Sequence, residues 1–343
     1  MGSSGAPSSE GPSDGSPPAG DVGARRSRIL RGVLLAAGLI ILVVLVREVG
    51  VEQVLRTLAG AAPWMPLVIA FDLSFFACEA MAHRAVLGPG RAGIPWSRFV
   101  RSSFLYYCVL AIAPLGRAGA EVARGASFTP YVGAGRAAAA AANVQGAVLL
   151  ANLFISTPCW IAVALTVGPG HLLAWLLLVN GVGTGVLGLV TLAIVRRSRV
   201  GTWLGAKIPR LARMGAELDS AVIAPKRDLA IAIAWCAGAR TVQVGMYAAI
   251  LAGIGASVTL LGTLVALGVH LVGAGLGDLV PNQVGILEGT YRVFADAVGL
   301  ADDPARAMSI ALVARIGQFV VAGTGLAILS MRARDTVPER ASA

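Results

Sequence analysis

The sequence predicts an all-α polytopic membrane protein with about eight transmembrane helices. Of its 343 residues, 56% are hydrophobic and only 13% are charged, whereas a soluble domain usually carries about 25% charged residues. Apolar runs long enough to cross a bilayer as helices, about 20 residues each, recur along the chain. Two short polar segments interrupt this pattern in the same way, which predicts two opposed re-entrant hairpins related as an inverted repeat.

The N-terminal region divides into a polar tail and a first helix. Residues 1–24 are rich in Ser, Gly and Pro, so they are predicted to be disordered. Four arginines between positions 25 and 31 then precede an apolar run over 32–46. Arg47 and Glu48 follow this run without a small-residue cleavage pattern, so we expect a retained first helix rather than a cleaved signal peptide.

The rest of the transmembrane domain, expected over residues 25–332, is read from its apolar runs. Further spans are predicted at 63–81, 99–115, 137–165, 171–195, 229–252, 258–280 and 306–331. Pro158 is expected to bend or tilt the long fourth span. Glycines at 181, 185 and 188, and at 273, 275 and 277, are typical of helix contact surfaces.

A basic loop and a C-terminal tail complete the predicted domain organisation. Residues 196–228 form a basic cytoplasmic loop, and residues 333–343 form a C-terminal tail. The apolar and basic residues of the loop are typical of an amphipathic helix on the membrane surface. They are equally typical of a solvated positive loop that sets topology.

The two interruptions share their composition and spacing. The first, PLGRAGAEVAR, runs from Pro114 to Arg124, and the second, PNQVGILEGTYR, runs from Pro281 to Arg292. Each opens with Pro, and each places a Glu seven residues later, Glu121 and Glu288. The prolines would set the breaks, while Gly116, Gly119 and Gly285 would permit close approach of the backbone.

The distribution of basic residues predicts the orientation. If both interruptions re-enter the side from which they came, 22 of the 28 Lys and Arg lie on one side together with both termini. By the positive-inside rule this side is cytoplasmic. The first hairpin then opens to the cytoplasm and the second to the outside of the plasma (inner) membrane. Cations that flank apolar runs anchor helices and meet anionic lipid, so the net charge of +10 indicates no nucleic-acid partner.

Ionisable residues inside the predicted membrane region are the candidate site. They are Asp72, Glu79, Glu121, Arg124, Arg240, Asp278, Glu288, Arg292 and Arg315. Because a charge facing lipid costs about 3 kcal/mol or more, these groups must face one another or a wet cavity. Glu121 with Arg124, and Glu288 with Arg292, are spaced for local pairs that either serve the site or only hold the hairpins. Asp72 and Glu79 are expected either to serve the site or to act as structural counter-ions for Arg240 or Arg315.

The motifs of the interruptions resemble a known family. The Pro–Gly–Glu–Arg segment after the third span, the PNQVGILEG segment and Arg315 in ALVARIGQ are similar to motifs of the lysylphosphatidylglycerol synthase transmembrane region. In the multiple-peptide-resistance proteins this region moves aminoacylated lipid between leaflets, and a separate soluble domain makes the lipid. Since the chain ends soon after its last span, we expect that synthase domain to be absent. Asn282 and Gln283 stand where the family commonly has small residues.

The resemblance implies a flippase or transporter of a phospholipid or a lipid-linked head group. Its substrate-binding residues would be Glu121, Arg124, Arg240, Glu288, Arg292 and Arg315, with Pro114, Pro281, Gly119 and Gly285 shaping the site. Arginines suit phosphate because their planar fork donates two hydrogen bonds. The two glutamates would contact the head group or carry a coupling proton. No cofactor or metal is expected, because the four cysteines and three histidines lack metal-ligand spacing.

Two alternatives belong to other classes of protein. A membrane enzyme acting on lipid-linked substrates would use Glu121 or Glu288 as its general base. A non-transporting partner in an envelope-synthesis complex would depend on the basic loop at 196–228 rather than on the buried polar residues.

Overall fold

The structure, a computed structural model, describes residues 51–112, 116–196, 200–207, 225–277 and 283–330, with a few isolated positions besides. Over these residues the chain is helical and contains no strand. The predicted N-terminal tail, the first helix, most of the basic loop and the C-terminal tail lie outside the described residues. So do Pro114, Asp278 and Pro281.

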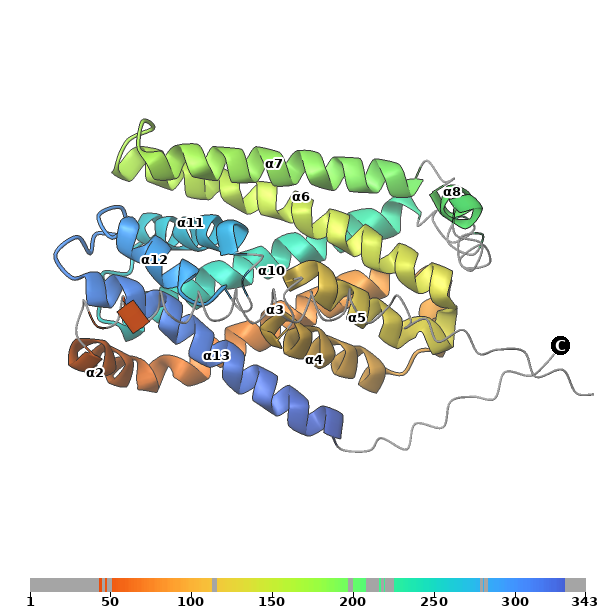
Figure 1. Ribbon diagram of the computed structural model, residues 1–343, viewed down its shortest axis with the longest axis horizontal. Coiled ribbons are helices and arrows are strands. Elements are labelled where there is room, and N and C mark those ends of the chain that lie inside the picture. Colours follow the sequence, from red (N-terminus) through yellow and green to blue (C-terminus); the bar gives the residue numbers. More distant parts are fainter. Residues whose placement is uncertain are drawn as a thin grey trace, which may run out of the picture.

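The helices follow one another through short connections. In chain order they are α2 (Val51–Ala61), η1 (Ala62–Trp64), α3 (Met65–Val86), η2 (Gly88–Gly93), α4 (Trp96–Ile112), α5 (Gly116–Val132), α6 (Ala134–Thr166), α7 (Leu172–Arg196), α8 (Val200–Lys207), α10 (Lys226–Gly253), α11 (Leu260–Gly277), α12 (Ile286–Val293) and α13 (Pro304–Ser330). Figure 1 shows most of the long helices lying roughly along the long axis of the molecule, with α6 and α7 side by side.

Six stretches of the described chain are long and apolar enough to cross a membrane. They are Val54–Val86, Ala134–Thr166, Leu172–Arg196, Lys226–Gly253, Leu260–Gly277 and Pro304–Ile328. Each corresponds to a predicted span, and α6 runs as one helix through Pro158. The predicted span at 99–115 is a shorter helix, α4, of 17 residues. The expected number of eight spans is therefore not reproduced within the described residues.

Small residues allow the long helices to approach closely, as the glycine pattern predicts. A Cβ placed on Gly188 of α7 would lie 3.0 Å from the carbonyl oxygen of Gly146 on α6, and one on Gly185 would lie 2.7 Å from Leu153. On α11, a Cβ at Gly273 would meet Leu287 of α12 at 2.9 Å. Glycine thus allows the helix backbones to come into van der Waals contact. Such packing holds helices together in a membrane, where the hydrophobic effect does not drive their association.

Two pairs of helices form hairpins in opposite halves of the molecule. Helices α4 and α5 pack together on either side of residues 113–115, and α11 and α12 pack together on either side of 278–285. In Figure 1 the first pair lies in the right half and the second in the left half. Glu121 and Arg124, which were expected beside a break in the backbone, lie within the regular helix α5.

Side-chain contacts between neighbouring loops and helix ends identify the two ends of the molecule. At one end Nε of Arg98 donates to the carbonyl oxygen of Ser127 at 3.1 Å, and the guanidinium of Arg84 lies 4.0 Å from the ring centroid of Trp96. At the other end Nε2 of His171 lies 3.2 Å from Oδ2 of Asp296. We call the first the basic end. The starts of α6 and α10 lie there too, because a Cβ on Gly90 would lie 3.4 Å from Nη1 of Arg136 and a Cβ on Gly88 would lie 3.8 Å from Oδ2 of Asp228. In Figure 1 the end of α7 lies on the same side. These segments carry Arg91, Arg136, Arg196, Lys226 and Arg227.

Candidate functional site

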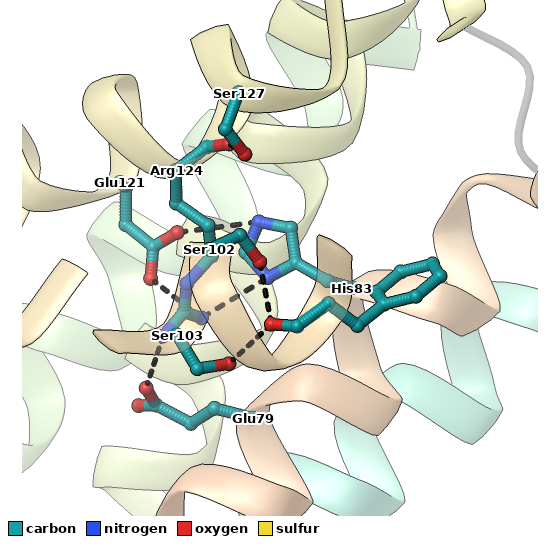
Figure 2. A network of polar contacts seen from close by, with 8 residues as sticks. Glu79, His83, Ser102, Ser103, Glu121, Arg124 and Ser127 are labelled. Carbon is teal, nitrogen blue, oxygen red and sulfur yellow. Dashed lines mark hydrogen bonds and ion pairs between the residues drawn. The ribbon is translucent and has the colours of Figure 1, made fainter. Parts of the chain in front are cut away.

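A buried cluster of charged side chains joins α3 to α5. We call Glu79, His83, Glu121 and Arg124 the α3–α5 cluster (Figure 2). Arg124 donates from Nη2 to Oε2 of Glu79 at 3.3 Å and from Nη1 to Nδ1 of His83 at 3.2 Å. The same Nη1 lies 3.7 Å from Oε1 of Glu121. Although Arg124 is a large cation, its relative exposure is 0%, so these partners replace the water that it loses.

Helical spacing explains why these four side chains meet. Glu79 and His83 are four residues apart on α3, and Glu121 and Arg124 are three residues apart on α5, so each pair lies on one face of its helix. The third helix, α4, supplies Tyr106, and the guanidinium of Arg124 lies 4.0 Å from the centroid of its ring. The aromatic face attracts the cation and closes the site from that side.

The contacts of His83 determine how its ring is protonated. A guanidinium can only donate hydrogen bonds, so Nδ1 of His83 accepts from Arg124. Nε2 then carries the proton, and it lies 3.3 Å from Oε2 of Glu121. The imidazole therefore bridges the cation and the carboxylate of α5, and both of its nitrogens face charged groups (Figure 2).

The three serines labelled beside the cluster in Figure 2 donate hydrogen bonds to backbone carbonyl oxygens. Oγ of Ser102 and of Ser103 both donate to the carbonyl oxygen of Phe99, at 2.7 and 3.0 Å, and Oγ of Ser127 donates to the carbonyl oxygen of Arg124 at 2.6 Å. Helical Ser residues commonly satisfy their hydroxyls in this way. They make the surroundings of the cluster compact rather than adding to its charge.

A second buried ion pair joins α12 to α13. Glu288, with 0% relative exposure, forms an ion pair with Nη1 of Arg315, which is itself buried. Nη2 of Arg315 also donates to the carbonyl oxygen of Gln283 at 3.2 Å, and Oε2 of Glu288 accepts from the backbone N–H of Gly285 at 2.9 Å. We call Glu288 and Arg315 the α12–α13 pair.

Local backbone geometry places Glu288 at the start of its helix. Gly285 precedes α12 with a φ of 79°, a conformation that residues with a side chain rarely adopt. The carboxylate then reaches back to the N–H of Gly285, in the manner of a helix cap. The ion pair of Glu288 is made with Arg315 across helices, whereas the spacing had predicted a local pair with Arg292, whose side chain is partly exposed.

The other predicted site residues are placed as follows. Arg240 is buried in α10, donates to Oε1 of Gln243 at 2.9 Å and lies 5.9 Å from the ring centroid of Phe75. Gly119 lies in α5, two residues before Glu121. Glu79 pairs with Arg124 rather than with the expected Arg240 or Arg315, while Asp72 accepts a hydrogen bond from Tyr107.

One residue of the cluster was not recognised from the sequence. His83 was interpreted as one of three scattered histidines, yet it contacts both Glu121 and Arg124. Its signal was the spacing Glu79-x-x-x-His83 inside an apolar span, which places two polar side chains on one helical face. Among the described residues no group of three or more His, Cys, Asp or Glu side chains is arranged to hold a metal ion.

The arrangement suits the recognition of an anion within the membrane. Each site holds a guanidinium against a carboxylate, so an incoming phosphate can take the place of the carboxylate as the acceptor of two parallel N–H bonds. The displaced carboxylate can in turn accept from an ammonium or hydroxyl group of the same ligand.

Comparison with known proteins agrees with this description. The family model of the lysylphosphatidylglycerol synthase transmembrane region matches residues 29–325, a stretch that contains both buried sites. No curated protein and no solved structure matches the chain. The chain is therefore a membrane protein that belongs to the lysylphosphatidylglycerol synthase transmembrane region family.

Proposed function

We propose that this protein moves a lipid with a phosphate-containing head group from one leaflet of the plasma membrane to the other. The observation that carries the proposal is the presence of two buried arginine–carboxylate sites, each with a glutamate on a helical hairpin, in opposite halves of one membrane domain. A lipid transporter needs a polar place for the head group while the acyl tails stay in hydrocarbon.

The arrangement of the hairpins supports access from both faces. The described ends of α4 and α11 that adjoin residues 113–115 and 278–282 lie toward the middle of the long axis in Figure 1. Glu121 and Glu288 each lie within the first turns of the helix that follows. This geometry fits two re-entrant hairpins that enter from opposite faces, as an inverted repeat produces.

Charge at the two ends supports an orientation. The basic end carries Arg and Lys at the connections around α3, α4, α6, α8 and α10, whereas the other end carries Asp296, Asp302 and Asp303 beside Arg306. The positive-inside rule places the basic end in the cytoplasm. The α3–α5 cluster would then serve the cytoplasmic leaflet and the α12–α13 pair the outer leaflet.

The exchange of partners at each arginine provides the mechanism. Without substrate, Arg124 is held by Glu79, His83 and Glu121, and Arg315 is held by Glu288. A lipid phosphate competes for the guanidinium, and the carboxylate that it displaces then accepts from an ammonium or hydroxyl group of the same head group or takes up a proton, because an unpaired charge in the membrane is costly. The apolar outer faces of α6 and α7, with exposed Phe154, Val179 and Leu189, remain in contact with lipid tails.

A leaflet assay with purified protein tests the proposal. Liposomes carry a labelled anionic phospholipid in the inner and outer leaflets, and a membrane-impermeant quencher reports how fast the inner label reaches the outside. We expect the wild-type protein to speed this exchange. Arg124→Gln should slow it about 10-fold or more, because a hydrogen bond to a charged group contributes about 1.5–3 kcal/mol.

The matched control is Arg136→Gln, which removes an exposed arginine at the start of α6 and should leave the rate unchanged. If wild-type protein moves no lipid, or if Arg124→Gln moves lipid as fast as the control, the proposal is wrong. Mass spectrometry of the recovered lipids distinguishes movement, which leaves the lipid species intact, from an enzymatic reaction, which alters them.

A further inference from the structure

Asp72 is a buried carboxyl group outside both arginine sites. It lies on α3 with a relative exposure of 4%. Its Oδ1 accepts a hydrogen bond from the hydroxyl of Tyr107 on α4 at 3.3 Å. Its Oδ2 is buried and has no hydrogen-bond partner among the groups that the structure describes. A Cβ placed on Gly317 of α13 would lie 3.2 Å from this oxygen, so Oδ2 packs against the backbone of α13.

This environment differs from that of the other buried carboxylates. Glu79, Glu121 and Glu288 each lie within ion-pair distance of an arginine. Among the residues that the structure describes, no arginine or lysine lies within ion-pair distance of Asp72.

The charged and titratable groups around Asp72 are few. They are Tyr107 on α4, Tyr247 on α10, which interacts electrostatically with both Asp72 and Arg240, and Glu79 two turns further along α3. Arg240 is engaged by Gln243 and lies against Phe75, and on α13 the arginine Arg315 is held by Glu288. The groups that interact with Asp72 are thus phenols, while Arg240 and Arg315 are bound to other partners.

Physical chemistry links the proton on such a group to the packing around it. A buried carboxylate without a cation carries a desolvation cost that a neutral carboxylic acid avoids. Contact of α3, α4 and α13 therefore favours the protonated form of Asp72, and access of water or a cation to Oδ2 favours loss of the proton. Since a proton favours the closed packing, proton binding and helix separation are coupled equilibria.

The position of Asp72 connects this equilibrium to both arginine sites. Helix α4 belongs to the first hairpin and supplies Tyr106 to the α3–α5 cluster, while α13 carries Arg315. The contact between α4 and α13 continues beyond Asp72, where Sγ of Cys108 donates to the carbonyl oxygen of Ala322 at 3.5 Å. Separation of these two helices would therefore expose Asp72 and move parts of both sites.

We propose that Asp72 carries a coupling proton, so that the pH difference across the membrane drives the movement of lipid. This inference rests on the lipid transport proposed above. It assigns the coupling role to Asp72 rather than to Glu121 or Glu288, because Glu288 is paired with Arg315 and Glu121 lies within reach of both Arg124 and His83.

Steady-state lipid distribution in liposomes tests the coupling. With one proton moved per lipid, a difference of one pH unit should enrich labelled lipid in one leaflet about 10-fold, because about 1.4 kcal/mol corresponds to a factor of ten. Reversing the pH difference should reverse the enrichment, and this result does not depend on how the protein is oriented in the liposome. Asp72→Asn, which is nearly the same shape but cannot release a proton, should abolish the enrichment.

Two further variants test whether the effect on lipid enrichment is specific to Asp72. Glu52→Gln alters an exposed, surface-paired carboxylate on α2 and should enrich lipid as the wild type does. Tyr107→Phe removes the hydrogen bond that favours the ionised form of Asp72, so it should move the pH dependence of the transport rate toward higher pH while transport persists. A purely structural role for Asp72 predicts no such displacement.

The outcomes separate the two proposals. Lipid movement by wild-type protein without enrichment under a pH difference overturns proton coupling and leaves lipid transport standing. Full enrichment by Asp72→Asn overturns the role of Asp72. Absence of any lipid movement by wild-type protein overturns both. If Asp72→Asn is not monodisperse in detergent, an unchanged pH dependence in Tyr107→Phe overturns the inference by itself.

Discussion

At the scale of single residues, the burial of each arginine determines how much its ion pair contributes to the stability of the fold. Arg315 and Arg306 are both on α13, and each has an acidic partner. Arg315 is buried against a fully buried Glu288, whereas the side chain of Arg306 is 40% exposed and pairs with Asp303 at 3.3 Å. Burial makes the first pair sensitive to the loss of either member, because an unpaired charge in the interior has no water to replace its partner.

The two arginines therefore predict different stability effects. Arg315→Gln leaves Glu288 buried without its cation and should cost about 3–5 kcal/mol. Arg306→Gln disrupts a surface pair and should cost about 0–1 kcal/mol. Thermal unfolding of the two purified variants in the same detergent measures the difference. Equal melting temperatures would contradict the assignment of Glu288 and Arg315 as a buried ion pair.

At the scale of elements, close packing of α7 on α6 depends on glycines that have no room for a side chain. A Cβ on Gly188 would lie 3.0 Å from Cβ of Leu149 and 3.1 Å from the backbone nitrogen of Leu150. Backbone atoms cannot turn away as a flexible side chain can, so the two helices would have to separate. Gly183, on the same helix, has no atom within 4 Å of such a Cβ.

This contrast gives a prediction for one pair of variants. Gly188→Ala should destabilise the protein by about 1–3 kcal/mol through overpacking. Gly183→Ala should be neutral or slightly stabilising, since alanine is the better helix former by up to about 1 kcal/mol. Melting temperatures in detergent report both changes. A Gly188→Ala variant as stable as Gly183→Ala would show that α6 and α7 are not packed as described.

At the scale of the whole molecule, the two ends differ in charge, and the proposed orientation depends on this difference. Gly93 lies at the basic end and Gly170 at the opposite end. Both are exposed, and a Cβ added to either would meet no atom within 4 Å. Cysteine can therefore be introduced at each position without disturbing the packing, against a background of native cysteines of which Cys108, Cys159 and Cys236 are buried.

Labelling of intact cells with a membrane-impermeant thiol reagent tests the orientation. Gly170→Cys should react in intact cells, whereas Gly93→Cys should react only after the membrane is permeabilised. The wild-type protein, with Cys78 partly buried, measures the background. Reaction of Gly93→Cys from outside would invert the orientation, and reaction of both from the same side would exclude a membrane between the two ends.

Much of the architecture could be predicted from the sequence because it depends on local patterns. The apolar runs predicted six spans that the structure describes, within a few residues at each end except for the first, which begins at Val54 rather than at residue 63. The glycine spacing predicted the contact surfaces of α7 and α11. Each of these signals repeats with the period of one helix, so it can be read without knowing what lies beside that helix.

By itself, then, the sequence determined the membrane class, the course of the spans and the presence of buried Glu and Arg residues near two interruptions. Tertiary structure alone decided the partners: Arg124 meets Glu79 and His83 of α3, Glu288 meets Arg315 of α13, and Asp72 meets Tyr107 of α4. The physical reason is that a helix presents its side chains by local geometry. The groups that neutralise them come from helices distant in the chain, and only packing brings those helices together.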